Sequence, residues 1–161
     1  MSSSSSPKKV YVRDPEDDLL TVELPVDNTL TQLRTMAGTV MNTLGLGFSE
    51  AVYQSALETE MRLTPGITYV HEPTLPIFYK GFQVGCLKPD LLVNHTYIVE
   101  LKAVGPAYAK GKEQLRRYVV AAESLCSLAG KTPTTPTNPT KYTGVLINFC
   151  QNPVTFQVVR V

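Results

Sequence analysis

The chain has 161 residues, of which 43% are hydrophobic and 18% charged, so its composition excludes a disordered protein and fits one globular domain. The formal net charge is +1, so the chain has no global positive field, and any contact with nucleic acid requires a local basic patch. No sequence segment approaches the roughly 20 apolar residues of a membrane span, so no membrane partner is expected.

The first 26 residues are expected to lie outside the main domain. Residues 1–9 hold serines and two lysines but no apolar stretch, which predicts a disordered tail rather than a secretory signal. Residues 10–26 carry two short β-favouring runs around an acidic stretch, a pattern typical of a peripheral hairpin or extension.

The cysteines indicate the compartment. Cys86, Cys126 and Cys150 are odd in number and form no CxxC pair, and two of them lie in apolar runs. We therefore expect buried, reduced thiols rather than a disulfide or a zinc site. Because of these reduced thiols and the lack of a secretory signal in residues 1–9, we expect an intracellular protein, cytoplasmic or nuclear and not secreted.

The main domain, residues 27–161, is expected to open with two helices and to continue with strands. Apolar residues recur at three- and four-residue spacing over residues 29–44, and again after a candidate cap at Ser49 as far as residue 63. The later hydrophobic runs predict four strands, a third helix between Pro106 and Gly130, and two final strands. The predicted strands span residues 67–71, 75–79, 82–93, 97–104, 144–149 and 154–159. This order predicts an α/β fold with a mixed sheet flanked by helices, and the Pro/Thr-rich residues 131–141 are expected to form an exposed loop.

Two charged residues interrupt the apolar strand predicted over residues 97–104. Glu100 and Lys102 are two residues apart, so their side chains point to the same face. Charges in a core strand are costly unless they are paired or bind a metal. Since Ile98 shares their face, we expect a strand covered on one side, with a polar site at one end of the second side.

Asp90 joins this pair only if the hairpin between the two strands has a suitable register. A two-residue turn at Asn94 and His95 would place Asp90 opposite Val99, on the wrong face. A three-residue connection, residues 94–96, places Asp90 opposite Glu100, and Asn and His both tolerate the left-handed backbone that this needs. A bulge near Pro89 would have the same effect.

Two carboxylates in this arrangement can chelate Mg²⁺ or Mn²⁺. Asp90 and Glu100 would be the metal ligands, with the carbonyl of Leu101 as a further oxygen. The metal would activate a water and neutralise a phosphate oxygen, while Lys102 positions that water or offsets charge in the transition state. The alternative is an ordinary Glu–Lys pair on a sheet, because the spacing D-x9-E-x-K also occurs by accident.

A second motif lies at the start of the second predicted helix. Gly47, Glu50 and Tyr53 resemble the signature of the GxxExxY protein family, which is grouped with the PD-(D/E)xK nucleases. Further segments resemble that family in order over roughly residues 30–161. They are His71-Glu72-Pro73, Leu75-Pro76, Phe78-Tyr79-Lys80-Gly81, Pro89-Asp90, Val99-Glu100-Leu101-Lys102, Glu113-Gln114-Leu115 with Tyr118, and Gly144-Val145-Leu146-Ile147-Asn148-Phe149.

The resemblance implies a restriction-endonuclease-like core and roles for particular residues. Besides the ligands Asp90 and Glu100 and the catalytic Lys102, it implies that Glu50 is an acidic group near the metal and that Gln114 faces the site. Without it, Glu50 is a favourable negative charge in the first turn of a helix and Gln114 a solvated side chain. Tyr53 and Tyr118 are expected to be core aromatics.

The third predicted helix adds basic residues. Together with Gln114, its Lys112 and Arg116 are the candidate substrate contacts, in a basic strip suited to a phosphate backbone. The full strip comprises Lys88, Lys102, Lys110, Lys112, Arg116 and Arg117. The alternative is a solvated helix face, and the sequence shows no aromatic ladder of the kind that single-strand binders use.

These patterns favour an Mg²⁺-dependent nuclease that hydrolyses DNA or RNA. The alternative is a catalytically inactive nuclease-fold protein that acts as a nucleic-acid or protein binding and assembly module, since a fold alone does not establish an activity. A homodimer is expected if both strands of a duplex are cut.

Overall fold

The computed structural model describes residues 28–105, 108–129 and 141–160, without the side chains of residues 108–109 and 126–129. The expected tail at 1–9, the expected hairpin at 10–26 and the loop at 131–141, apart from Lys141, lie outside the described residues. Pro106 and Gly130, the expected limits of the third helix, lie outside them as well.

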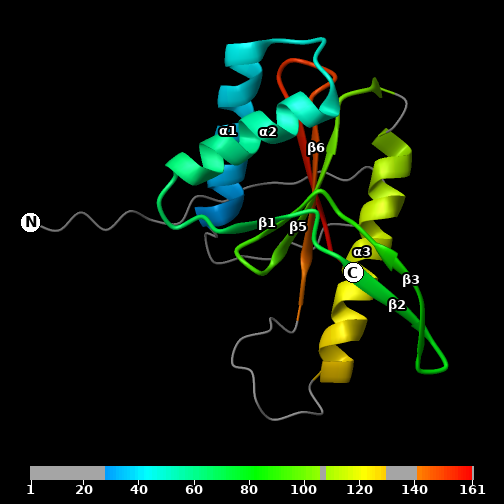
Figure 1. Cartoon of the computed structure of the whole chain (residues 1–161). Helices are drawn as coiled ribbons and strands as arrows, with labels where there is room; N and C mark the ends of the chain where they lie inside the picture. The colour runs from blue at the N-terminus through cyan, green and yellow to red at the C-terminus, as the bar shows by residue number, and fades with distance from the viewer. Residues whose placement is uncertain (1–27, 106–107, 130–140, 161) are drawn as a thin grey trace, which may run out of the picture.

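A five-stranded mixed sheet forms the centre of the molecule, and a separate two-stranded sheet lies beside it (Figure 1). The large sheet has the order β1-β4-β5-β6-β7, in which only β5 and β6 are parallel, and β2 pairs with β3. The elements are α1 (Asn28–Leu44), α2 (Glu50–Leu63), β1 (Tyr69–His71), β2 (Leu75–Tyr79), β3 (Phe82–Leu87), β4 (Leu91–Val93), β5 (Tyr97–Lys102), α3 (Tyr108–Ala129), β6 (Thr143–Asn148) and β7 (Thr155–Val159).

Helices cover both faces of the large sheet. Val99 and Leu101 of β5 belong to the apolar cluster that contains the buried residues of α1 and α2. Ile98, on the opposite face, packs with Leu115 and Val119 of α3. The expectation that the second side of this strand lies open is therefore wrong, because α3 closes it and leaves only the end near Glu100 and Lys102 for a polar site.

The first two helices form where their apolar spacing predicts them. Their buried residues recur at three- and four-residue intervals, which places them on one stripe facing the sheet: Leu33, Met36, Ala37, Val40 and Met41 in α1, and Tyr53, Leu57 and Met61 in α2. Ser49 occupies the N-cap position of α2, but its side chain makes no capping hydrogen bond. Its backbone carbonyl instead accepts hydrogen bonds from Val52 and Tyr53.

The run predicted as one strand over residues 82–93 forms two strands in different sheets. β3 ends at Leu87 and pairs with β2, whereas β4 begins at Leu91 and pairs with β1 and β5. Pro89 lies between them, and proline has no N–H to donate to a ladder. Apolar composition alone did not reveal this break.

The cysteines differ in part from expectation. Cys86 and Cys150 are free thiols, as expected, but Cys86 is exposed and Cys150 only half-buried. Cys86 lies on the two-stranded sheet, which none of the described helices covers on its outer side (Figure 1). The side chain of Cys126 lies outside the described part of the chain. Among the residues that the structure describes, none of the helices is long and apolar enough to cross a membrane.

Candidate active site

The turn between β4 and β5 sets the register of the site. Val93 pairs with Tyr97, Leu92 with Ile98 and Leu91 with Val99, so the connection has three residues, as the second of the expected registers requires. Asn94 and His95 adopt positive φ angles of 47° and 57°. Continued by one residue, this register sets Asp90 opposite Glu100.

Asn94 holds this turn against its neighbours. Its side-chain oxygen accepts a hydrogen bond from the backbone N–H of Thr68 at 2.8 Å, and its amide nitrogen donates to Thr29 at 3.0 Å. Its backbone N–H donates to the carbonyl of Thr68 at 2.8 Å. The turn is therefore fixed to α1 and to the segment before β1, which makes a slip in register costly.

The β4–β5 ladder of backbone hydrogen bonds ends just before the site. There the side chain of Asp90, rather than a backbone group of β4, bonds to β5. The next position of the ladder would set Pro89 opposite Leu101, and proline has no N–H to offer the Leu101 carbonyl. The Oδ2 atom of Asp90 instead accepts the Leu101 N–H at 2.6 Å. Asp90 is thereby fixed by the strand that carries Glu100, and the ladder provides no donor for the Leu101 carbonyl.

Glu100 and Lys102 form an ion pair at the end of β5. The Nζ atom of Lys102 donates to Oε1 of Glu100 at 2.7 Å, and their side chains are only 12% and 3% exposed. The other carboxylate oxygen, Oε2, is buried and has no hydrogen-bond partner. A buried carboxylate oxygen without a donor is costly, so this atom is suited to binding a cation.

Glu50 approaches the pair from the first turn of α2. Its Oε1 lies 3.8 Å from Nζ of Lys102, so the structure brings Glu50 to the same ammonium group as Glu100. The preceding turn includes Gly47 with φ +101°, a backbone conformation that favours glycine. Tyr53 anchors this turn, because its hydroxyl donates to the Gly45 carbonyl at 2.7 Å and its ring stacks on Phe149.

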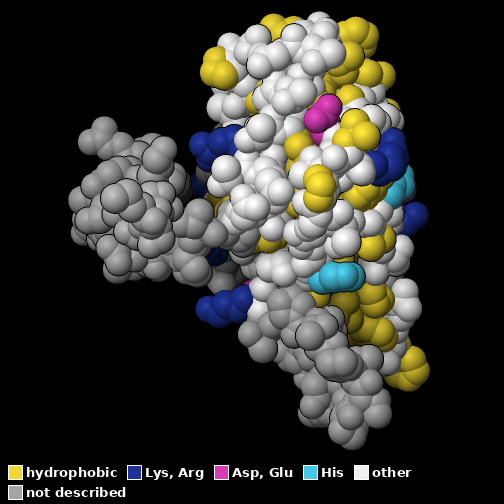
Figure 2. All heavy atoms as spheres, turned by 90° about the vertical axis from the view of Figure 1, so that its left-hand side faces the viewer, with side chains coloured by type: hydrophobic (Ala, Val, Ile, Leu, Met, Phe, Trp, Pro, Cys, Tyr) yellow, Lys and Arg dark blue, Asp and Glu magenta, His cyan; other side chains and the backbone are white. Residues whose placement is uncertain are grey.

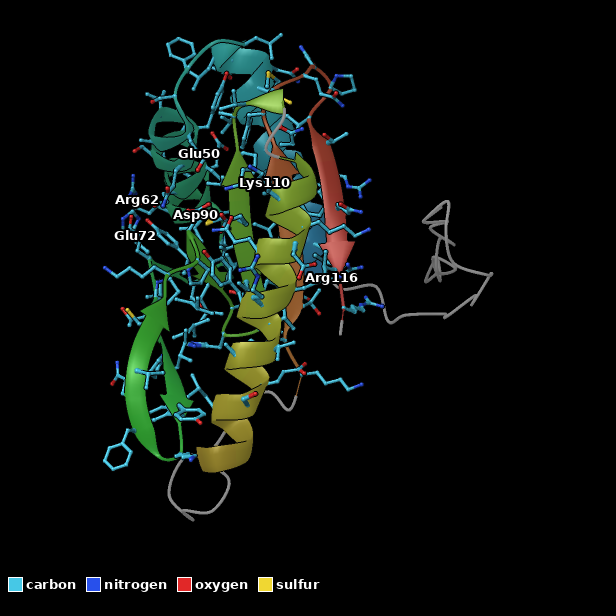
Figure 3. The ribbon with its side chains drawn as sticks, turned by 90° about the vertical axis from the view of Figure 1, so that its right-hand side faces the viewer. Glu50, Arg62, Glu72, Asp90, Lys110 and Arg116 are labelled. Carbon is cyan, nitrogen blue, oxygen red and sulfur yellow. The ribbon has the colours of Figure 1, made fainter. Side chains whose placement is uncertain are left out.

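The three residues Gly47, Glu50 and Tyr53 thus have separate structural roles. Glycine allows the turn, glutamate faces the lysine, and tyrosine, 1% exposed, is part of the core as expected. Tyr118 is also buried. Figure 3 shows that Glu50, on α2, and Asp90, directly before β4, lie near each other.

Burial and mutual repulsion perturb the two carboxylates. Burial and, to a smaller extent, the negative charge of Asp90 raise the pKa of Glu100 to about 7, against the opposing hydrogen bond and charge of Lys102. The pKa of Asp90 is also raised. Burial is the main cause, and the hydrogen bond from the Leu101 N–H and the charge of Lys102 oppose it. Burial alone would lower the pKa of Lys102, but the hydrogen bond and charge of Glu100 leave it raised. The site therefore holds more negative charge than its single lysine neutralises.

The donor set is suited to a hard divalent cation. The Asp90 carboxylate, the unpartnered Oε2 of Glu100 and the Leu101 carbonyl are all oxygen ligands, which Mg²⁺ prefers. In the described residues, however, no three His, Cys, Asp or Glu side chains already converge as a metal-binding group. Two carboxylates and a carbonyl, with water completing the shell, remain the predicted ligand set.

Gln114 lies near the site but does not contact the carboxylates. Its amide donates to the hydroxyl of Tyr118, and that hydroxyl donates to the Lys88 carbonyl at 3.3 Å, two residues before Asp90. Arg116 lies 3.9 Å from Glu113 on the exposed surface of α3. Lys112 is half-buried, and neither Lys112 nor Arg116 lines the groove that contains Gln114, which is bounded by Leu87, Lys110, Glu113, Gln114, Arg117 and Tyr118.

The sequence reasoning missed a contact between α2 and Asp90. Gln54 donates to the backbone carbonyl of Asp90 at 3.4 Å, and the Glu72 N–H donates to the same carbonyl at 2.9 Å. Gln54 also lies 3.2 Å from Nδ1 of His71, which is 2.7 Å from Glu58. The available signal was spacing, since Gln54 follows Glu50 by four residues and so shares its face of the helix.

Comparison with known proteins agrees with this geometry. A family model described as the PD-(D/E)XK nuclease superfamily matches residues 27–129, from the start of α1 to the end of α3. The chain belongs to the PD-(D/E)XK nuclease superfamily. The match includes Pro89, Asp90, Glu100 and Lys102, which spell the motif of the superfamily, and the mixed sheet flanked by helices is consistent with its restriction-endonuclease-like fold. No curated protein and no solved structure matches the chain.

Proposed function

We propose that this protein is a metal-dependent nuclease that hydrolyses phosphodiester bonds of DNA or RNA. We also propose that, within the superfamily, it belongs to the GxxExxY protein family. The observation that carries the proposal is the buried Glu100 carboxylate, which faces Asp90 with one oxygen unpartnered. A purely structural Glu–Lys pair leaves no reason for a second acidic side chain opposite it. The superfamily match supports nuclease-type chemistry.

Each residue has a defined part in this proposal. Asp90, Glu100 and the Leu101 carbonyl would hold Mg²⁺ or Mn²⁺, which when bound lowers the pKa of water and neutralises phosphate charge. Lys102 lies within 2.7 Å of Glu100 and 3.8 Å of Glu50, so its ammonium group is fixed where it can orient a nucleophilic water or offset developing negative charge. Glu50 orients that lysine and adds negative charge beside the metal.

The direct test measures cleavage of plasmid, linear duplex, single-stranded DNA and RNA across Mg²⁺ and Mn²⁺ concentrations. We expect metal-dependent products from the wild type and none from Asp90→Ala. Glu60→Gln is a matched control, because Glu60 lies on α2 ten residues after Glu50. Cleavage that survives Asp90→Ala would indicate a contaminating nuclease and would count against the proposal.

Calorimetric titration separates this function from the inactive alternative. A folded protein that binds neither Mg²⁺ nor Mn²⁺ at millimolar concentration would favour a binding or assembly module. Metal binding that Glu100→Gln abolishes, without loss of the folded state, would support the proposed ligand set. A homodimer is expected only if duplex substrates are cut on both strands, which sedimentation of the protein with and without substrate tests.

A further inference from the structure

The β2–β3 hairpin lies outside the five-stranded sheet. Its base packs on α3 through Leu75 and Leu87, which join the apolar cluster of that helix. Beyond this base the hairpin continues alongside α3 and ends in a free tip (Figures 1 and 3). It is therefore anchored at the end that leads into Asp90 and exposed at the other.

The tip of the hairpin presents aromatic rings to solvent. Tyr79 and Phe82 are direct cross-strand partners on either side of the Lys80-Gly81 turn, and they are 63% and 77% exposed, with Phe78 at 46%. Hydrophobic side chains also gather along one edge of the face drawn in Figure 2. Contiguous exposed apolar surface of this kind marks an interaction site.

The charge at the tip of the hairpin is positive. Lys80 is the only charged residue between 75 and 87, and the next charged residue, Lys88, follows the base of the hairpin. The Nζ atom of Lys80 lies 5.5 Å from the centre of the Tyr79 ring, so ring and cation form one surface. A second copy of this hairpin would bring no carboxylate to that cation, whereas a polyanion with aromatic bases complements both features.

A groove connects the base of this hairpin with α3. It has a volume of about 520 Å³ and is lined by Leu87 of β3 and by residues of α3 that include Lys110, Gln114 and Arg117. Lys110 and Arg117 are seven residues apart, so they lie two turns from each other on one face of the helix. Because Tyr118 in the same lining donates to the Lys88 carbonyl, the groove borders the candidate active site.

We propose that the β2–β3 hairpin and this groove bind an unpaired stretch of DNA or RNA, an inference that rests on the nuclease function proposed above and names its substrate class. Bases stack on Tyr79 and Phe82, and phosphates contact Lys110 and Arg117. Base faces are available for stacking only where the nucleic acid is unpaired. Phosphate contacts carry affinity without sequence preference. The substrate class is therefore single strands, or duplexes with single-stranded ends or flaps.

Binding is measured by fluorescence anisotropy with the whole chain in EDTA, so that the readout needs no catalysis. The probes are labelled single-stranded DNA, single-stranded RNA, a blunt duplex and the same duplex with a single-stranded overhang. We expect the single strands and the overhang to bind about tenfold or more tighter than the blunt duplex, since stacking is worth ~1–3 kcal/mol per base. The DNA and RNA arms decide which of the two is preferred.

Variants at the tip distinguish stacking from other contacts. Phe82→Ala and Tyr79→Ala should each weaken single-strand binding about fivefold to a hundredfold. Phe82→Tyr should restore it and Phe82→Leu should not, because leucine keeps the apolar surface but has no ring. Leu63→Ala, at another exposed apolar residue on α2, is the matched control and should change nothing. Lys110→Ala and Arg117→Ala should each reduce the salt dependence of binding by about one ion.

The results separate this inference from the nuclease function. Equal binding of blunt duplex and single strand, or unchanged binding by Phe82→Ala, overturns the inference even if metal-dependent cleavage is found. Single-strand binding that depends on the hairpin, without any cleavage, would support the inference and contradict the proposed nuclease function. A wild-type dimer that Phe82→Ala converts to a monomer would show that the hairpin joins two copies, and would also overturn it. If the protein binds none of the oligonucleotides, the inference is also overturned.

Discussion

Two hairpins follow each other in this chain, separated by only three residues, and they are built for different tasks. β4–β5 lies inside the large sheet, where Leu91, Val93, Val99 and Leu101 are fully buried. β2–β3 lies outside it and exposes Tyr79, Phe82 and Val84. One hairpin fixes chemical groups, and the other offers surface.

The comparison shows how a short segment can separate rigidity from accessibility. Catalytic groups must be held within a fraction of an ångström, and the ladder of the buried hairpin and the side chain of Asn94 would hold the proposed ones in this way. A substrate contact needs exposure instead. Pro89 ends the pairing of one hairpin before the other begins, so the two properties do not interfere.

The largest effect is expected from deleting Leu92. The three-residue connection over residues 94–96 would remain, but Asp90 would then oppose Val99 and Leu91 would turn out of the core. We expect loss of cleavage and a fall in unfolding free energy of more than about 3 kcal/mol, measured by denaturant unfolding. Deleting Gly81 in the exposed hairpin should cost less than half as much, and equal losses would contradict the comparison.

Asp90→Asn separates charge from position in the buried hairpin. The amide oxygen can still accept the Leu101 N–H, so the fold should persist, but the charge of a proposed metal ligand is lost. Cleavage should fall about a hundredfold or more, with a melting temperature close to that of the wild type. An active Asp90→Asn variant would remove Asp90 from the proposed ligand set.

Truncations of comparable side chains test the difference in burial. Ile98→Ala in β5, where the side chain is 1% exposed, should destabilise the protein by about 2–5 kcal/mol. Val84→Ala in β3, where exposure is 62%, should change stability by no more than about 0.5 kcal/mol. Denaturant midpoints at constant slope measure both, and similar losses would show that the outer hairpin is covered in solution.

The smallest effect is expected where β1 borders the buried hairpin. The hydrogen bond with Glu58 raises the pKa of His71 above 6.5, helped by the charges of Glu58, Glu72 and Asp90 and opposed by burial. A raised pKa means that this contact stabilises the fold fully below pH about 6.5 and that its contribution is lost as pH rises through the folded-state pKa. Titration of the His71 ring by NMR should show the shift, and Glu58→Gln should abolish it.

Local signals in the sequence predicted the buried hairpin better than its exposed neighbour. The spacing of Glu100 and Lys102 predicted their shared face, and the tolerance of Asn94 and His95 for positive φ made feasible the register that sets Asp90 opposite Glu100, although a two-residue turn remained an alternative until the structure showed three residues. Both helices before the sheet followed from apolar periodicity. These features depend on residues close to one another in the chain.

The remaining features depend on tertiary packing. Pro89 was a local signal for a break in residues 82–93, but nothing local indicates that the two parts of the run belong to different sheets. The sequence also showed no aromatic ladder, because Tyr79 and Phe82 become neighbours only when the hairpin pairs. Likewise, Gln54 meets the Asp90 carbonyl only after α2 has packed on the sheet.

The parallel pairing of β5 with β6 has a consequence for how the protein is made. These strands adjoin along their whole length, and the Phe149 N–H binds the Lys102 carbonyl at 2.6 Å, yet the entire α3 crossover separates them in the chain. Closing so long a connection is entropically slow and raises the contact order. During synthesis on a ribosome, β5, which carries Glu100 and Lys102, therefore remains an edge strand until β6 emerges, so the candidate site is completed late.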